Sequence, residues 1–198
     1  MDAAEILTAC GAMLQGHFLL SSGNHSNRYF QCARLLQFPQ RAAEVLSGPC
    51  RALGLAKKEG LLDFDLAVGP AMGGIIVAYE AGRQLGIPAL FTERDESGAM
   101  CLRRGFEIPR GARVIITEDV ITTGKSTLET ARALEAAGAR VAASLCVVDR
   151  RPGGDGNPFP WEIFSALRQS AVYYEPSRCP LCAEGKVPLV KPGSRPSK

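Results

Sequence analysis

Two adjacent carboxylates, Glu118 and Asp119, end an apolar run and are followed by a short hydroxyl-rich segment, residues 122–126. Small residues let a backbone approach a ligand closely, and successive N–H groups at the start of a helix suit a phosphate. The Thr and Ser hydroxyls of this segment can donate further hydrogen bonds. Two carboxylates suit sugar hydroxyls, or a positive charge that develops on a ribose ring. The pattern therefore predicts a site for a sugar phosphate, and a plain strand–turn–helix with surface acids is the simpler alternative.

A nucleotide-binding P-loop is the rival interpretation, because Gly124-Lys125-Ser126 looks like the end of that motif. The motif requires a glycine five positions before its last glycine, and this position holds Asp119. A carboxylate there, preceded by Glu118, would not cradle a polyphosphate. The sequence therefore excludes a P-loop.

Two further segments carry groups that can bind anions. Residues 69–74, Gly-Pro-Ala-Met-Gly-Gly, follow an apolar strand and open a helix, so their N–H groups can face an anion, although the dinucleotide spacing G-x-G-x-x-G is absent. Asp149 and Arg150 close the last apolar strand. An Arg can form a planar two-point pair with a carboxylate, while a solvated Arg at a strand end is the alternative.

The elements that would position these groups alternate regularly between residues 65 and 149. Apolar strands are expected at 65–69, 89–92, 113–117 and 140–149, and helices at 74–85 and 126–137, which end at Gly86 and Gly138. Such alternation indicates βαβ units and a parallel sheet, whose ligands bind at the carboxyl ends of the strands. Residues 93–112 interrupt the pattern and are expected to form an active-site loop.

The flanking segments are less regular. We expect a helix over residues 3–15, a turn over 21–27, a strand over 29–36 and a helix over 40–54 that stops at Gly54. The tail from residue 176 is rich in Pro, Gly and Lys, and is expected to pack loosely, to extend or to join the N-terminal segment. We expect one domain over 1–198, divided into an N-terminal segment 1–38, a core 60–150, the loop region 93–112 and the tail 176–198.

Composition excludes some classes of protein. The net charge of +3 gives no argument for nucleic acid or membrane binding, no apolar run reaches the ~20 residues of a membrane helix, and residues 1–5 do not begin a signal peptide. A cytoplasmic protein is therefore expected. Five of the seven cysteines suit small buried side chains. Cys179 and Cys182 form half a zinc site, but there is no second pair, and His17 and His25 are expected to lie remote from them. A knuckle in the tail or a site bridged by a dimer stays open.

The order of apolar strand, acidic pair and Thr/Gly loop resembles the ribosyl pyrophosphate motif of type I phosphoribosyltransferases. Residues 17–30 resemble the N-terminal signature of the orotate phosphoribosyltransferases, in which a Ser-Gly turn and an aromatic pair form part of a hood over the base. The matching residues are Ser22, Gly23, Ser26, Tyr29 and Phe30. The resemblance implies an α/β fold, a central parallel sheet flanked by helices with a small hood, and transfer of ribose 5-phosphate from 5-phosphoribosyl 1-diphosphate to orotate.

The resemblance also implies roles for individual residues. Those implied in catalysis are Glu118, Asp119 and Arg94. Those implied in binding the ribosyl diphosphate are Glu118, Asp119, Val120, Ile121, Thr122, Thr123, Gly124, Lys125, Ser126, Met72, Gly73 and His25. Those implied in binding orotate are Thr122, Arg150, Tyr29 and Phe30. Mg²⁺ is expected to bind through the diphosphate and the ribose hydroxyls of the substrate, without a dedicated protein ligand. The family also implies a homodimer with shared active sites, and no nucleic-acid or membrane partner.

The chain departs from the family pattern at several positions. His25 and Gly73 stand where many members have Lys, and the short loop 93–105 carries Arg94, Arg103 and Arg104 but no Lys or His. This matches a short-loop branch of the family. A purine phosphoribosyltransferase, or a non-catalytic regulator that senses the ribosyl diphosphate, are the alternatives.

Overall fold

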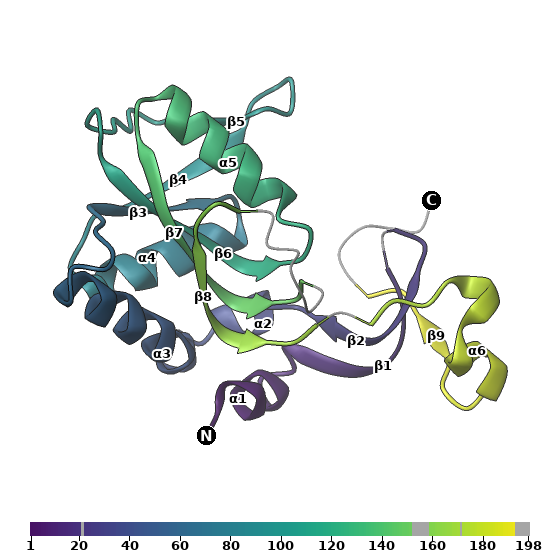
Figure 1. Ribbon diagram of the computed structural model, residues 1–198. Coiled ribbons are helices and arrows are strands. Elements are labelled where there is room, and N and C mark those ends of the chain that lie inside the picture. The colour runs from purple at the N-terminus through teal and green to yellow at the C-terminus, as the bar shows by residue number, and fades with distance from the viewer. Residues whose placement is uncertain (21, 152–158, 171, 193–198) are drawn as a thin grey trace.

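A six-stranded sheet forms the centre of the computed structural model, which describes residues 1–20, 22–151, 159–170 and 172–192 (Figure 1). The strands lie in the order β5-β4-β3-β6-β7-β8. Their bounds are β3 Leu66–Pro70, β4 Ala89–Arg94, β5 Met100–Leu102, β6 Arg113–Ile121, β7 Arg140–Asp149 and β8 Glu162–Arg168. All neighbours pair in parallel except β4 and β5. The predicted α/β fold with a mainly parallel sheet is therefore confirmed.

Helices cover both faces of this sheet, with α3 (Pro39–Lys58) and α4 (Gly73–Leu85) on one face and α5 (Lys125–Ala136) on the other (Figure 1). Successive residues of β6 point to opposite faces. Ile115 packs in the cluster that contains Val77 of α4, whereas Ile116 packs in the cluster that contains Leu134 of α5. Both faces are therefore apolar, which explains the near-continuous hydrophobic runs of the strands.

The direction in which the chain winds reverses between β3 and β6. The chain passes from β3 through α4 to β4 on one side, and from β6 through α5 to β7 on the other. Ligands of open α/β sheets bind where the direction of winding reverses, outside the carboxyl ends of the strands. The loops that follow β3 and β6, and Arg150 just after β7, all lie at this edge, so the residues predicted to bind anions come together.

A smaller three-stranded sheet, which we call the hood, projects beside the core (Figure 1). Its order is β2-β1-β9, with β1 Met13–Leu19, β2 His25–Phe30 and β9 Leu189–Val190. The remaining helices are α1 Ala3–Ala9, α2 Ala33–Leu36, the 3₁₀ turn η1 Pro176–Arg178 and α6 Pro180–Glu184. Tyr174 exchanges two backbone hydrogen bonds with His25, of 2.8 and 2.9 Å, so the tail returns to the hood. The expectation that the tail joins the N-terminal segment holds for residues 174–190.

The N-terminal elements differ from those predicted. The first helix ends at Ala9, just before Gly11 at φ +65°, and Met13 and Leu14 lie in β1, because a short apolar run fits a strand as well as a helix. The strand expected over 29–36 ends at Phe30, and residues 33–36 are helical. The helix expected to stop at Gly54 runs on to Lys58, with Gly60 at φ +73° after it.

The segment 93–112 begins as a hairpin rather than a loop. Strands β4 and β5 pair from Thr92 with Leu102 to Arg94 with Met100, and the Asp95 carboxylate accepts hydrogen bonds from the backbone N–H groups of Ser97 and Ala99. Ser21 of the predicted turn and residues 193–198 of the tail lie outside the described residues. Among the described helices, none is both long enough and apolar enough to cross a membrane.

Candidate active site

The acidic pair lies within β6 rather than after it, because the strand continues to Ile121. Adjacent strand residues point to opposite faces, so Glu118 and Asp119 leave the strand on different sides. The Asp119 carboxylate turns back to accept a 2.8 Å hydrogen bond from the backbone N–H of Val120. The two carboxylates are therefore neighbours in the chain with different surroundings.

Burial gives both carboxyl groups unusual protonation behaviour. Glu118 is 8% exposed, and its burial, reinforced by the charge of Asp119, raises its pKa to about 8. Burial also raises the pKa of Asp119, against the opposing effect of the N–H of Val120. At neutral pH Glu118 is therefore mostly protonated, so it can donate a hydrogen bond to a hydroxyl.

The loop between β3 and α4 touches this pair. A Cβ atom placed on Gly73 would lie 2.5 Å from Cγ of Asp119, and one placed on Gly69 would lie 2.0 Å from the backbone oxygen of Gly74. Gly69 therefore requires glycine, because its Cβ would meet backbone, whereas a side chain at Gly73 would displace the Asp119 carboxylate. Met72, which is 82% exposed, precedes the helix, and its peptide bond with Ala71 is cis. The predicted ribosyl-diphosphate residues Met72 and Gly73 thus lie beside Asp119, at the start of α4.

The predicted phosphate loop follows β6 directly. Thr122 and Thr123 are exposed, and Gly124 adopts φ +76°, which reverses the chain into α5. No side chain caps this helix start, so its first N–H groups face outward, apart from a long 3.4 Å contact between the N–H of Lys125 and the Thr123 hydroxyl. The Lys125 side chain is exposed. This geometry suits the terminal phosphate of a sugar, as predicted from the residues.

Arg150 lies at the carboxyl end of β7, the next strand of the sheet. Its residue is 6% exposed, its guanidinium stacks over the Phe30 ring at 5.1 Å, and its Nε has no hydrogen-bond partner. Within the described part of the chain no carboxylate pairs with it, and burial lowers its pKa. The adjacent Arg151 differs, because it holds Asp149 through two 2.9 Å hydrogen bonds. The buried positive charge of Arg150 therefore has no anionic partner among the described residues. A ligand that carries a carboxylate can supply one.

The aromatic pair divides between two faces of the hood. Phe30 is buried in the main core and supports Arg150 from below. Tyr29 is partly buried, packs at 5.9 Å from the Phe18 ring, and donates a long 3.4 Å hydrogen bond to Gln31. Side chains alternate along a strand, so the two rings cannot present the same face to a ligand. Of the two predicted orotate contacts, Phe30 is therefore a support for Arg150.

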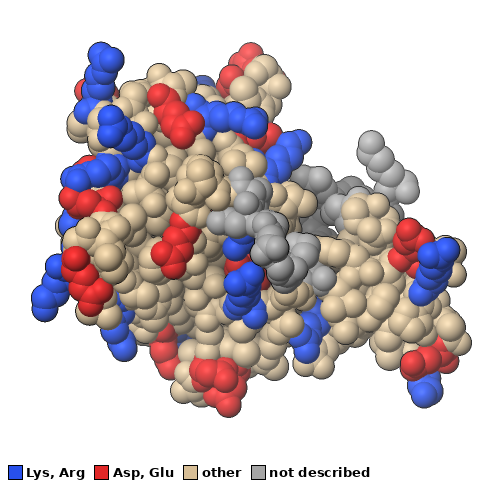
Figure 2. Space-filling view, in the orientation of Figure 1, with Lys and Arg blue, Asp and Glu red and all other residues tan. Residues whose placement is uncertain are grey.

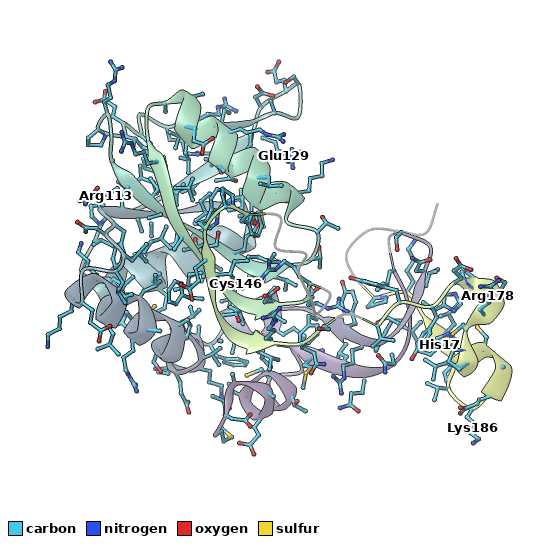
Figure 3. The ribbon with its side chains drawn as sticks, viewed as in Figure 1. His17, Arg113, Glu129, Cys146, Arg178 and Lys186 are labelled. Atoms are coloured by element: carbon cyan, nitrogen blue, oxygen red, sulfur yellow. The ribbon has the colours of Figure 1, made fainter. Side chains whose placement is uncertain are left out.

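The arginines of the short loop are held by carboxylates. Arg94 donates a 2.5 Å hydrogen bond to Glu129 of α5, the residue labelled on that helix in Figure 3. Lys125, at the start of α5, lies 3.9 Å from the same carboxylate. Arg103 and Arg104 both pair with Glu93, at 3.5 and 2.8 Å. Arg94 therefore stands beside the phosphate-loop helix but is engaged, and reaching a diphosphate would require it to leave Glu129.

His25 lies in a different environment from the one predicted. Its ring is 5% exposed, and Nδ1 lies 3.0 Å from Nε2 of His17 and 3.3 Å from Sγ of Cys182. These contacts engage the His25 ring within the hood. The predicted role of His25 in binding the ribosyl diphosphate is therefore corrected. The view that the two histidines are remote from the cysteine pair is also wrong. The pairing of β1 with β2 brings the two histidines together. The return of the C-terminal tail, which brings the cysteines to them, could not be predicted from the periodicity of the sequence.

Comparison with known proteins agrees with this geometry. Residues 62–164 match the model of the phosphoribosyl transferase domain. The chain is 52% identical over 193 residues to an orotate phosphoribosyltransferase from Heliobacterium modesticaldum, with 96% of each chain covered. It is similar to the crystal structure of orotate phosphoribosyltransferase from Aeropyrum pernix, at 28% identity and a TM-score of 0.66, covering 83% of this chain and 92% of that one.

A second solved structure, orotate phosphoribosyltransferase from Mycobacterium tuberculosis in complex with inorganic phosphate, is 25% identical with a TM-score of 0.62, covering 84% of this chain and 95% of that one. The matched region contains the acidic pair, the phosphate loop, the 69–74 loop and Arg150. On the site geometry and these similarities together, the chain belongs to the phosphoribosyl transferase family.

Proposed function

We propose that the protein is an orotate phosphoribosyltransferase, which transfers ribose 5-phosphate from 5-phosphoribosyl 1-diphosphate to orotate. The products are orotidine 5′-phosphate and diphosphate, in the synthesis of pyrimidine nucleotides. The similarity to the Heliobacterium modesticaldum enzyme over nearly the whole chain supports this activity. A cytoplasmic location stays a prediction from the sequence.

The single observation that carries the choice of base is the buried guanidinium of Arg150, which no carboxylate of the described residues pairs with and whose Nε has no hydrogen-bond partner. Purine bases carry no carboxylate, whereas orotate carries one, and a planar two-point pair with that group would neutralise the charge. Arg150 follows β7, adjacent to the strand that leads into the phosphate loop. A base bound there would therefore lie beside the ribose of a donor whose phosphate sits at residues 122–126.

The reaction follows from the positions of the other groups. The N–H groups and hydroxyls of residues 122–126 hold the 5-phosphate, and the 69–74 loop holds the diphosphate. As the bond at C1 of the ribose breaks, positive charge develops on the ring, and Asp119 stabilises it. Glu118, protonated in the free enzyme, donates a hydrogen bond to a ribose hydroxyl and keeps its proton. Ionised orotate supplies its own nucleophilic nitrogen, so positioning provides much of the rate.

Asp119 also fits a divalent cation carried by the substrate. Mg²⁺ prefers six oxygen ligands and commonly binds through one or two carboxylates together with phosphates and water. Asp119 offers one such carboxylate beside Gly73 of the 69–74 loop. When bound, Mg²⁺ would neutralise charge on the departing diphosphate.

A homodimer with shared sites forms part of the proposal. Met72, Ile76 and Tyr79 lie about one turn apart on α4, and are 82, 45 and 70% exposed. This apolar stripe supports self-association at the helix that begins at the diphosphate loop. In the dimer, Arg94 of one subunit would leave Glu129 and reach the other subunit's diphosphate. Light scattering measures the oligomer, and mixed dimers of Arg94→Ala and Asp119→Asn chains test the sharing. Recovery of activity is expected, and its absence would place each site within one chain.

The activity itself is tested by the loss of orotate absorbance with purified protein, ribosyl diphosphate and Mg²⁺. Uracil, adenine, hypoxanthine and xanthine are assayed in parallel. Turnover of orotate alone is expected. Turnover of a purine without orotate would show that Arg150 serves another purpose, and no turnover of any base would favour a regulator that only binds the donor.

A further inference from the structure

A cluster of two histidines and two cysteines lies in the hood, apart from the loops that form the candidate active site. His17 and His25 come from β1 and β2, whereas Cys179 immediately precedes α6 and Cys182 lies in its first turn. Figure 3 shows His17 against the C-terminal segment, near Arg178 and Lys186. Three of the four residues are buried, and Cys182 is exposed. Segments about 160 residues apart in sequence thus meet at one point.

The four potential ligand atoms form a compact group, all within 4.8 Å of one another. Nε2 of His17 lies 3.0 Å from Nδ1 of His25, 3.4 Å from Sγ of Cys179 and 3.6 Å from Sγ of Cys182. Sγ of Cys182 lies 3.3 Å from Nδ1 of His25. Tetrahedral zinc bonds require about 3.3 Å between two nitrogens, about 3.6 Å between nitrogen and sulfur and about 3.8 Å between sulfurs. The cluster therefore has the dimensions of a zinc coordination shell.

The hydrogen bonding of His17 leaves the correct nitrogen available for a metal. Its Nδ1 lies 3.3 Å from the backbone oxygen of Val187, which can only accept a hydrogen bond. The ring proton therefore resides on Nδ1, and the lone pair of Nε2 points into the cluster. Histidines that bind metals commonly donate their other N–H to a carbonyl in this way.

The local fold explains how these residues converge. The register of β1 and β2 shifts between Gln15 and Phe18, and His25 pairs with Leu19, two residues after His17, so both rings lie on one face of the hairpin. The two-residue strand β9 pairs with His17 and Phe18, and the tail also bonds to the hood at Tyr174. Cys179 and Cys182 have the C-x₂-C spacing of zinc ligands.

We propose that His17, His25, Cys179 and Cys182 bind one Zn²⁺ ion, which fixes the C-terminal tail to the hood hairpin. Nitrogen and thiolate ligands in a tetrahedron favour zinc over Mg²⁺, which takes oxygen ligands. Four protein ligands leave no open position, so the site is structural rather than catalytic. Both thiols lose their protons on binding, and the ion's charge is balanced by the two thiolates. The site does not depend on the identity of the transferred base.

The experiment measures the zinc content of the purified wild-type protein by elemental mass spectrometry, after dialysis against metal-free buffer. Cys179→Ser and Cys182→Ser remove one ligand each, and Cys101→Ser is the matched control, because Cys101 lies in β5 outside the cluster. About one zinc ion per chain is expected in the wild type and in Cys101→Ser, and less than about a tenth of that in the two ligand variants.

Two measurements on the wild type keep the test decisive if a ligand variant does not fold. Replacement by Co²⁺ should give the strong visible bands and thiolate charge-transfer absorption of a tetrahedral sulfur-bound ion. Removal of the metal with a chelator should lower Tm and speed proteolysis within residues 172–190 by about tenfold or more, with both effects reversed by added zinc.

Three results would overturn the proposal. The first is a wild type that contains no zinc and fails to bind added zinc, which would indicate a cluster joined only by hydrogen bonds. Intact mass could reveal a Cys179–Cys182 disulfide in protein purified without oxidant. Zinc content could be equal in the wild type and in both folded ligand variants.

Discussion

Replacing Arg150 with Met separates a ligand-binding role from a structural one. The guanidinium is buried, stacks on Phe30 and has no carboxylate partner in the described chain, so the folded protein bears the cost of its desolvation without an ion pair to offset it. Met keeps most of the apolar volume over the ring and removes the charge. We therefore expect the free energy of unfolding of Arg150→Met to equal or exceed that of the wild type.

The effect on catalysis should be large and opposite in sense. Truncating one partner of a buried, hydrogen-bonded charge pair costs about 2–5 kcal/mol, because the remaining charge stays desolvated and unpaired. For orotate in the site this corresponds to a loss of kcat/KM of roughly 30-fold to several thousand-fold. The KM for the ribosyl diphosphate should change little, because its phosphate binds at residues 122–126.

The matched control is Arg151→Met. Arg151 and Asp149 form a buried two-point pair with side chains 10 and 3% exposed, so breaking it should destabilise the protein by about 3–5 kcal/mol and lower Tm by roughly 6–20 °C. Thermal unfolding and steady-state kinetics with orotate are measured on both variants. If Arg150→Met unfolds as readily as Arg151→Met while keeping full activity, the reasoning about the unpaired guanidinium is refuted.

Other expectations follow from the acidic pair and its loop. Asp119→Asn should lower kcat by about 100-fold or more and keep or raise Tm, because burial already disfavours the charged form; unchanged kcat would remove Asp119 from the mechanism. The folded protein keeps a proton on Glu118 up to a pKa of about 8, whereas the unfolded chain releases it near the ordinary value. The contribution of Glu118 to stability is therefore complete at low pH and is lost as pH rises to about 8. Over this range the free energy of unfolding should fall by up to about 1.4 kcal/mol per pH unit. Urea unfolding of Glu118→Gln should show a flatter pH dependence. Gly73→Ala should displace the Asp119 carboxylate and lower kcat/KM for the ribosyl diphosphate by about tenfold or more. Gly54→Ala, whose Cβ would meet only Cδ2 of Leu85 at 3.9 Å beyond α3, should leave kinetics unchanged and stabilise by about 0.5–1 kcal/mol.

The alternating core was predictable because its signals are local. The helix that starts at Gly73 ends at Gly86 with φ +68°, as the glycine indicated, and the strands from Leu66 to Asp149 follow their apolar runs. The phosphate loop could be proposed from the sequence because its backbone and its hydroxyls are adjacent in the chain. Its predicted role needs no distant partner.

The hood was harder to predict because its structure depends on contacts between distant segments. The run from Met13 contains too few residues to distinguish a helix from a strand by periodicity. Whether His25 serves the donor or the hood depends on where the tail containing Cys182 returns, about 157 residues later. The difference between Arg150 and Arg151 depends on which side chain reaches Asp149, and a sequence pattern carries no such information.

Phe30 belongs to the hood strand β2 and to the main core, and its ring lies beneath Arg150. The aromatic ring beside the proposed anion site therefore comes from the hood, and its positive charge comes from Arg150 of the core. An anion that binds only when the hood is attached to the core must also strengthen that attachment. Thermodynamic linkage requires the two effects to be equal: attachment strengthens anion binding by the same factor. Amide exchange along β2 should accordingly slow when the base is bound, even at residues that never touch it.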